Sequence, residues 1–146
     1  MNKYVKIILV LAVIGVIVAL YVWFFVYNKP HRDYAAATPD RYVDAETLYY
    51  DFRQDKALGD SLYTGLILQV NGALNKVEHL DSTAIAVFVF EQGLFGDEGI
   101  RCIFIPGFHD DLSDYSPGDE ILIKGYCTGY NETDVIIEKA TIVTKE

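Results

Sequence analysis

An uninterrupted apolar run near the start of the chain is its most pronounced hydropathy pattern. Residues 7–27 form 21 consecutive positions without a charged side chain, and only Gly15 among them falls outside the hydrophobic class. At a rise of about 1.5 Å per residue, such a run forms a helix about 31 Å long, which matches a bilayer core of about 30 Å. We therefore predict that residues 7–27 cross a lipid bilayer once, with residues 1–6 as a cytoplasmic tail.

Aromatic and basic side chains gather at the far end of this run. Tyrosine and tryptophan favour the headgroup layer of a bilayer, and lysine and arginine can reach its phosphates. The predicted belt around the membrane anchor consists of Tyr21, Trp23, Tyr27, Lys29 and Arg32.

A cleaved signal peptide is the alternative interpretation of the same run. Lys3 and Lys6 provide a positively charged start, and residues 35–37 offer an A-x-A cleavage site. The apolar region of a signal peptide usually has about 7–15 residues, which is shorter than this one. The candidate cleavage site also lies beyond a charged stretch, so we favour an uncleaved anchor.

The next segments are a linker and one helix. Residues 28–43 contain two prolines and no periodic apolar pattern, which predicts a linker. Asp44 is a suitable N-cap, and Gly59 can end a helix that begins there. The helix has one apolar stripe, at Ala45, Leu48, Tyr49 and Phe52. Such a stripe indicates an amphipathic helix that covers another apolar surface.

From Thr64 onward the chain has the pattern of β-strands separated by turns. The expected strands are residues 64–77, 83–90, 99–105, 120–128 and 134–144. Asn71-Gly72 interrupts the first strand, where a glycine permits a sharp bend, and residues 106–117 leave room for a short helix. A long bent first strand and an insertion between the third and fourth are typical of an OB-fold. We predict a mainly β domain over residues 44–146, a five-stranded OB-fold barrel with a preceding amphipathic helix.

The charge of this domain bears on its partners. Residues 33–146 contain 8 basic and 21 acidic side chains, a net charge of −13. OB domains that bind single strands combine a basic groove with stacking aromatic rings, and binding to a polyphosphate depends on those cations. The candidate aromatic side chains of a binding face are Phe88, Phe90, Phe104, Tyr126 and Tyr130. Core packing is the default interpretation of the phenylalanines, and the charge makes nucleic acid an unfavoured partner.

Two acidic loops offer oxygen ligands without a metal-binding motif. Glu91, Asp97 and Glu98 surround glycines, and residues 109–114 contain one histidine and three aspartates. Neither stretch matches an EF-hand or a metalloprotease motif. We expect solvated acidic surfaces and no metal site.

The remaining reactive side chains form no catalytic pattern. Cys102 and Cys127 could form a disulfide in an exported compartment, or each could be a small buried hydrophobe, and the spacing leaves both interpretations open. His31 and His79 have no serine or cysteine nucleophile near them in a recognisable arrangement. No histidine is followed by tyrosine four residues later, the haem-attachment pattern of anchored OB haem chaperones. We predict no catalytic residue, no cofactor and no enzyme.

Several stretches together resemble a known family. They are Tyr27–Asp33 (YNKPHRD), Gly99–Phe104 (GIRCIF), Gly118–Tyr130 (GDEILIKGYCTGY) and Asp134–Ile137 (DVII). In combination they resemble the bacterial tRNA_anti-like family of small, membrane-anchored OB-fold proteins. The resemblance implies an OB-fold and an exported domain tethered to a membrane, and it implies no catalytic residues.

These features lead to one functional hypothesis and one alternative. The hypothesis is a non-enzymatic OB-fold module for binding or scaffolding, held in the bilayer by residues 7–27, whose partner is a protein or a small molecule. A single-pass protein of the bacterial inner membrane with its acidic domain in the periplasm fits this hypothesis. The alternative is that the OB barrel binds single-stranded nucleic acid.

Overall fold

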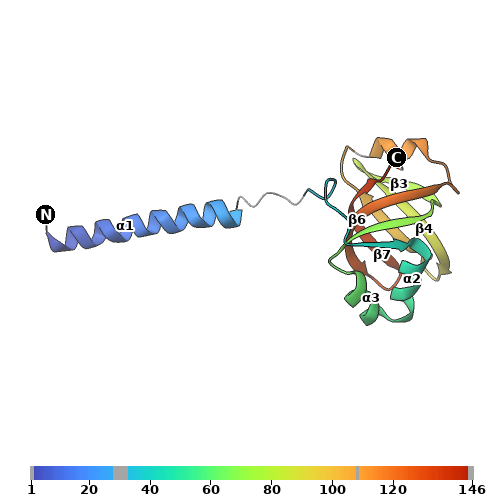
Figure 1. Ribbon diagram of the computed structural model, residues 1–146, viewed down its shortest axis with the longest axis horizontal. Helices are drawn as coiled ribbons and strands as arrows, with labels where there is room; N and C mark the ends of the chain where they lie inside the picture. Colours follow the sequence, from blue (N-terminus) through green and yellow to red (C-terminus); the bar gives the residue numbers. More distant parts are fainter. Residues whose placement is uncertain (1, 28–32, 108, 145–146) are drawn as a thin grey trace. The chain divides into compact units, whose positions relative to one another are not determined.

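The computed structural model describes residues 2–27, 33–107 and 109–144. The chain divides into two compact units, Met1–Arg32 and Asp33–Glu146, and each is described by itself (Figure 1).

The first unit is one apolar helix. It consists of α1 (Lys3–Val22) and a final π-helical turn, η1 (Trp23–Tyr27). Together these 25 residues are long and apolar enough to cross a membrane, and none of their described side chains is buried. A signal sequence near the N-terminus can meet the same criteria of length and composition. Of the predicted belt, the helix contains Tyr21, Trp23 and Tyr27, whereas Lys29 and Arg32 lie outside the described residues.

The second unit is a mainly β domain built on one seven-stranded sheet. The strand order is β1-β2-β6-β7-β5-β4-β3, with parallel pairing only for β1 with β2 and β5 with β7 among the described strands. The strands are β1 (Arg41–Asp44), β2 (Ile67–Ala73), β3 (Lys76–Leu80), β4 (Thr83–Gly93), β5 (Gly96–Phe104), β6 (Glu120–Tyr130) and β7 (Asp134–Ile142). The order of β2 to β7 is OB-like, because β2 and β3 follow each other in the chain and lie at opposite ends of the series.

The prediction of a mainly β, OB-like domain is confirmed, but the five-stranded barrel is corrected to a seven-stranded sheet that does not close into a barrel. The predicted strand over residues 64–77 is two strands, because the chain turns at Leu74 and Asn75 rather than at Asn71-Gly72. The backbone amide of Leu74 donates to the Asp119 carbonyl at 2.9 Å, and the amide of Asn75 donates to the Val87 carbonyl at 3.0 Å. This turn thus bonds both to β4 and to the residue before β6, while the sheet remains open and β1 extends it by another strand.

The predicted helix over residues 44–59 is also two helices. α2 (Ala45–Gln54) ends before Asp55, whose side chain accepts a hydrogen bond from the Leu58 amide at 3.1 Å and so caps α3 (Lys56–Tyr63). Asp44 precedes α2 without a side-chain capping bond, and Gly59 lies inside α3 instead of ending a helix. A favourable cap at Asp55 allows the chain to restart at a new angle.

The predicted apolar stripe of α2 is confirmed. Its four side chains, Ala45, Leu48, Tyr49 and Phe52, are all buried against the sheet. In Figure 1, α2 and α3 cover one end of the sheet, and the short 3-10 helix η2 (His109–Asp114), in orange, lies at the other. This helix confirms the short helix expected between the third and fourth predicted strands.

Part of the predicted linker lies against the sheet. Residues 28–32 fall outside the described residues, but the Tyr34 ring meets the Tyr126 ring edge-on at 5.7 Å. The Lys124 ammonium donates to the carbonyls of Ala35 and Ala37 at 2.7 and 2.8 Å. The folded unit consequently begins near Asp33, earlier than the sequence predicted.

Gly59 provides a test of the packing between the two helices. A Cβ atom at this position would lie 2.5 Å from Cδ1 of Phe52, a fully buried ring. Alanine normally stabilises a helix interior by about 1 kcal/mol relative to glycine, whereas overpacking a core costs about 1–3 kcal/mol. We expect Gly59→Ala to lower the free energy of unfolding in urea. In a Phe52→Leu background the same substitution should be less destabilising, and equal effects in both backgrounds would contradict this packing.

Candidate binding surface

Two of the five predicted binding-face aromatics belong to the core. Phe88 and Phe104 are 0% and 2% exposed, so neither ring has a face available for stacking on a base. Phe88 lies beside Gly72, close to Ala45 of α2, which covers this side of β4. The interpretation of these two residues as binding residues is corrected to core packing.

The other three aromatics lie in two separate places. Phe90 stacks on Tyr49 of α2 with ring centroids 5.4 Å apart, and Tyr130 stacks on Phe52 at 5.9 Å. Tyr126 lies under Tyr34, away from that cluster. The five aromatics therefore do not form one continuous binding face.

Tyrosine hydroxyls at the α2 cluster are donors and not acid–base groups. The hydroxyl of Tyr49 lies 3.4 Å from a carboxylate oxygen of Glu98, and burial raises its pKa well above the ordinary value. The hydroxyl of Tyr63 donates to Asp51 at 2.6 Å, and burial together with that bond raises its pKa to about 12. Both hydroxyls stay protonated at neutral pH.

An ionic network occupies the face of β3, β4 and β5 opposite the core. Arg101 on β5 lies between the buried residues Ile100 and Cys102, so alternation along the strand directs its side chain outward. Its guanidinium donates to Glu78 on β3 at 2.7 Å and to Asp134 on β7 at 3.1 Å.

Lys76 extends this network to the β4–β5 hairpin. Its ammonium lies 3.0 Å from Glu78 and 3.0 Å from Asp97. The hydrogen bond from Lys76 lowers the pKa of both carboxyl groups, and Arg101 and Gln92 add to the effect at Glu78 and Asp97 respectively. Two cations thus face three carboxylates, and the network has no positive charge left over.

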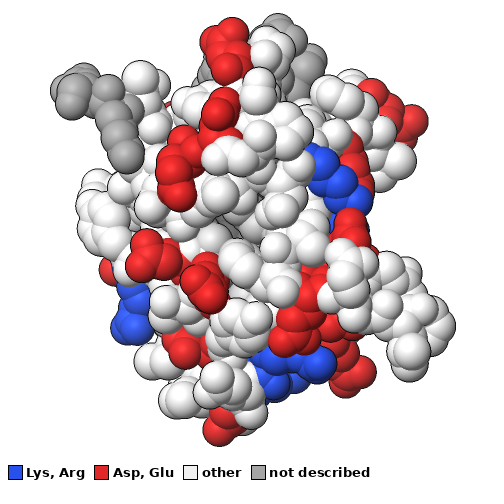
Figure 2. All heavy atoms as spheres, turned by 90° about the vertical axis from the view of Figure 1, so that its right-hand side faces the viewer, with Lys and Arg blue, Asp and Glu red and all other residues white. Residues whose placement is uncertain are grey.

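Basic side chains elsewhere on the surface also lie next to acidic ones. On the side shown in Figure 2, acidic side chains are spread over the face, and the basic side chains lie next to acidic ones. Within the described part of the chain, no group of three or more histidine, cysteine, aspartate or glutamate side chains is arranged to hold a metal ion.

The two cysteines are free and buried. Cys102 on β5 and Cys127 on β6 both align with Ile137 on β7, the strand between them. Two strand spacings separate their Cα atoms by about 9.5 Å, beyond the limit of about 7 Å for a disulfide. Burial raises the pKa of both thiols, that of Cys127 to about 11. Of the two interpretations left open by the sequence, the structure shows small buried hydrophobes and no disulfide.

The turn of the β4–β5 hairpin is a feature that the sequence reasoning missed. Leu94 and Phe95 form this two-residue turn, and each is 97% exposed. The available signal was an apolar pair between Gly93 and Gly96, in a stretch that was interpreted only through its acidic residues.

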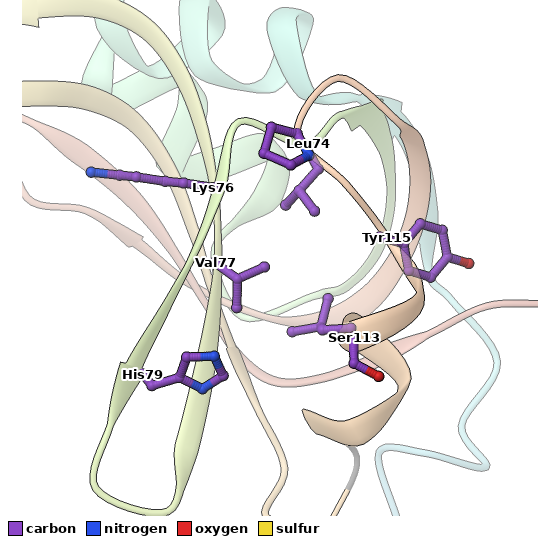
Figure 3. Close-up of a pocket in the computed structure, with 8 residues that line it drawn as sticks. Leu74, Lys76, Val77, His79, Ser113 and Tyr115 are labelled. Carbon is purple, nitrogen blue, oxygen red and sulfur yellow. The ribbon is translucent and has the colours of Figure 1, made fainter.

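A cavity of about 330 Å³ lies between β3 and η2 (Figure 3). Val77 and His79 point from β3 toward the cavity, whereas the Lys76 side chain extends to the other side of the strand. Its lining consists of Leu74, Lys76, Val77, His79, Leu112, Ser113, Tyr115 and Pro117. The cavity has room for a small apolar group, and its lining does not define a particular ligand.

Comparisons with known proteins agree with this architecture. The family model described as tRNA_anti-like matches residues 1–142. No curated protein matches the sequence. A crystal structure of a "putative nucleic acid-binding lipoprotein" from Klebsiella pneumoniae subsp. pneumoniae is similar, with a TM-score of 0.56, 20% sequence identity, and coverage of 80% of this chain and 100% of that chain. At this identity the similarity shows a shared fold.

Thiol labelling tests the arrangement of the cysteines. We expect Cys102 and Cys127 to resist a maleimide at about pH 8 in the folded protein, because both are buried with raised pKa values. Both should react in denaturant without prior reduction, as counted by mass spectrometry. Labelling in denaturant only after reduction would indicate a disulfide and would contradict the placement of Cys102 and Cys127 on either side of β7.

The ionic network should make stability depend on pH. Because the folded pKa of Glu78 is lowered, its contribution is complete above the ordinary value of 4.5 and is lost as pH falls through the lowered folded value. Urea unfolding between about pH 7 and about pH 3 should show a shallower decline for Glu78→Gln than for the wild type. Glu138→Gln, an exposed position on β7 outside the network, is the matched control and should keep the wild-type slope. Identical slopes for all three proteins would disprove the contribution.

Proposed function

Because the chain belongs to the tRNA_anti-like family, we propose that it is a non-enzymatic binding module, held at a membrane by its N-terminal helix, that recognises a protein partner. The observation that carries the proposal is the neutralisation of Lys76 and Arg101 by carboxylates on the face where an OB-fold would bind a nucleic acid strand.

Attachment to the membrane is supported by the first unit. The helix of Lys3–Tyr27 has the length and composition of a membrane span and leaves its described side chains exposed. A helix with about 20 exposed apolar residues is not stable in water, whereas a bilayer buries the whole surface. The structural neighbour is described as a lipoprotein, which favours membrane attachment for this fold as well. In the proposed topology the acidic domain lies on the periplasmic side of the inner membrane.

The charge of the sheet argues against nucleic acid as the partner. Association with a polyphosphate is driven by cations that replace counterions on the strand. Lys76 and Arg101 would first have to break ion pairs with Glu78, Asp97 and Asp134, and those carboxylates would then repel the phosphates. Phe88 on β4 and Phe104 on β5, two of the aromatic side chains that could have stacked on bases, lie in the core.

The chemistry of the reactive groups supports a binding role rather than catalysis. An enzyme usually positions a group whose pKa is close to the working pH. Here Tyr49, Tyr63, Cys102 and Cys127 have raised pKa values and stay protonated. Exposed apolar side chains, by contrast, are common at sites of protein contact.

Single-stranded nucleic acid remains the second candidate. It is favoured by one observation, the description of the structural neighbour as nucleic acid-binding. An OB-fold can bind a strand through a local basic groove, even where the domain as a whole is acidic.

Oligonucleotide titration distinguishes the two candidates. The full chain in detergent micelles is titrated into labelled single-stranded DNA and RNA of about 16 nucleotides at about 50 mM salt, and anisotropy is recorded. We expect no saturation up to about 100 µM, the weak end of non-specific binding. The variant Glu78→Gln with Asp97→Asn, which releases Lys76, should bind more tightly and lose that affinity in high salt. Saturable wild-type binding that Lys76→Gln and Arg101→Gln both weaken would establish the second candidate instead.

A further inference from the structure

The turn of the β4–β5 hairpin exposes two large apolar side chains in succession. Gly93 pairs with Gly96, so Leu94 and Phe95 are the two central residues of a tight turn. Both are 97% exposed, more than any other large apolar side chain described in the second unit. The next most exposed are Tyr42, Leu80 and Leu58.

Folding gives no reason for these residues at this position. Gly96 adopts the positive φ of this turn, at +128°, so the backbone conformation does not require particular residues at positions 94 and 95. Turn residues of hairpins are usually polar, because they face water. Leu94 and Phe95 make no contact with the core cluster, and a polar pair would close the same hairpin. Two large apolar side chains thus face water without packing on the core cluster, which is typical of functional positions.

The base of the turn is held in place. The Gln92 amide donates to Asp97 at 2.6 Å across the hairpin, and Asp97 pairs with Lys76 at 3.0 Å. The Glu98 side chain crosses Gly93 where another residue would have its Cβ atom, so a larger residue there would require this side chain to move. A turn fixed in this way loses little conformational freedom on binding, which favours affinity from a small contact.

The charge around the turn restricts the occupant. Residues 91–98 contain Glu91, Asp97 and Glu98 and no basic residue. Arg53 and Lys76 neutralise the first two, whereas the described contact of the Glu98 carboxylate is with the Tyr49 hydroxyl. An anionic lipid surface or a polyphosphate is therefore disfavoured, and a neutral or basic protein surface is favoured.

Within the second unit, the turn lies far from residues 35–37. The Lys124 side chain is hydrogen-bonded to residues 35–37. Lys124 pairs with Thr141 of β7, and the neighbouring Ala140 pairs with Phe104, so residues 35–37 lie near the Phe104 end of β5. The turn lies at the opposite end of β5, remote from the segment that leads to the apolar helix. In Figure 1 the yellow hairpin end accordingly lies away from residues 33–37.

From these observations we infer that Leu94 and Phe95 form a docking element that inserts into an apolar pocket with a neutral or basic rim on a partner protein. The inference rests on the proposed function and names the part of the domain that makes the contact.

A photoreactive phenylalanine analogue at position 95 tests the contact. Cells producing the full chain are irradiated with the analogue at Phe95 or, as a matched control, at Leu80, an exposed apolar residue at the end of β3. We expect a discrete protein adduct from position 95 that is absent from position 80 and is lost when Leu94→Asp is added. An adduct with lipid, with a second copy of this chain, or no adduct at all would overturn the inference.

Affinity measurements with the purified, cross-linked protein complete the test. Phe95→Ser should weaken binding by at least about tenfold, as expected for a central anchor, and Leu80→Ser by less than about twofold. Circular dichroism and urea unfolding should show the wild-type fold for both variants, because both positions are exposed. A partner that binds equally well to Phe95→Ser would overturn the docking element while leaving a protein-binding function intact. Oligonucleotide binding, by contrast, would overturn the proposed function itself.

Discussion

The corner at Leu74 and Asn75 is the constraint on which the arrangement of the domain depends. The backbone of Leu74 is hydrogen-bonded to Gly118 and Asp119, just before β6. The Asn75 amide donates to the carbonyl of Val87 on β4. Because this short segment changes direction while its backbone stays hydrogen-bonded, β2 can pair with β6 while β3 pairs with β4. Without β3 beside β4, Lys76 and Glu78 would not reach Arg101 and Asp97, and the hairpin would lose its support. The corner thus sets the position of the core, the ionic network and the exposed turn together.

The ionic network illustrates how the same residues can favour or exclude a ligand. Taken without their partners, Lys76 and Arg101 would make this face of the sheet a candidate site for a nucleic acid strand. Their carboxylate partners come from three different strands, and Asp134 is buried, also accepting a hydrogen bond from the Gly99 amide at 3.0 Å. Desolvated charges are retained in a fold only when they are paired and hydrogen-bonded. The cations therefore stabilise the packing of neighbouring strands, and the family's name alone does not make that face a nucleic acid site.

The sequence predicted features that depend on periodicity and missed those that depend on tertiary contacts. The stripe of α2 and most strand positions follow from patterns of 3.6 and 2 residues, and the apolar helix follows from the length of an uninterrupted apolar run. The separation of Cys102 from Cys127 depends on β7 lying between β5 and β6, which no spacing reveals. Phe88 and Phe90 do lie on the strand where they were expected, but the same helix whose stripe was predicted covers them. The strand and the helix were both predicted correctly, but the predicted binding face was wrong, because a local sequence pattern does not show which face of a sheet a helix covers.

A small docking element and a membrane tether complement each other physically. Two side chains in a turn bury far less area than the roughly 1,200 Å² of a stable protein interface, so their contact alone would be weak and short-lived. A tether that holds both partners at one membrane turns encounter into a nearly intramolecular event, with effective concentrations of the order of millimolar. Weak contacts are then populated, and they remain reversible because each one breaks quickly. An anchored, acidic domain with a rigid apolar turn is consistent with such a transient contact, since repulsion between like-charged surfaces limits association with unintended partners.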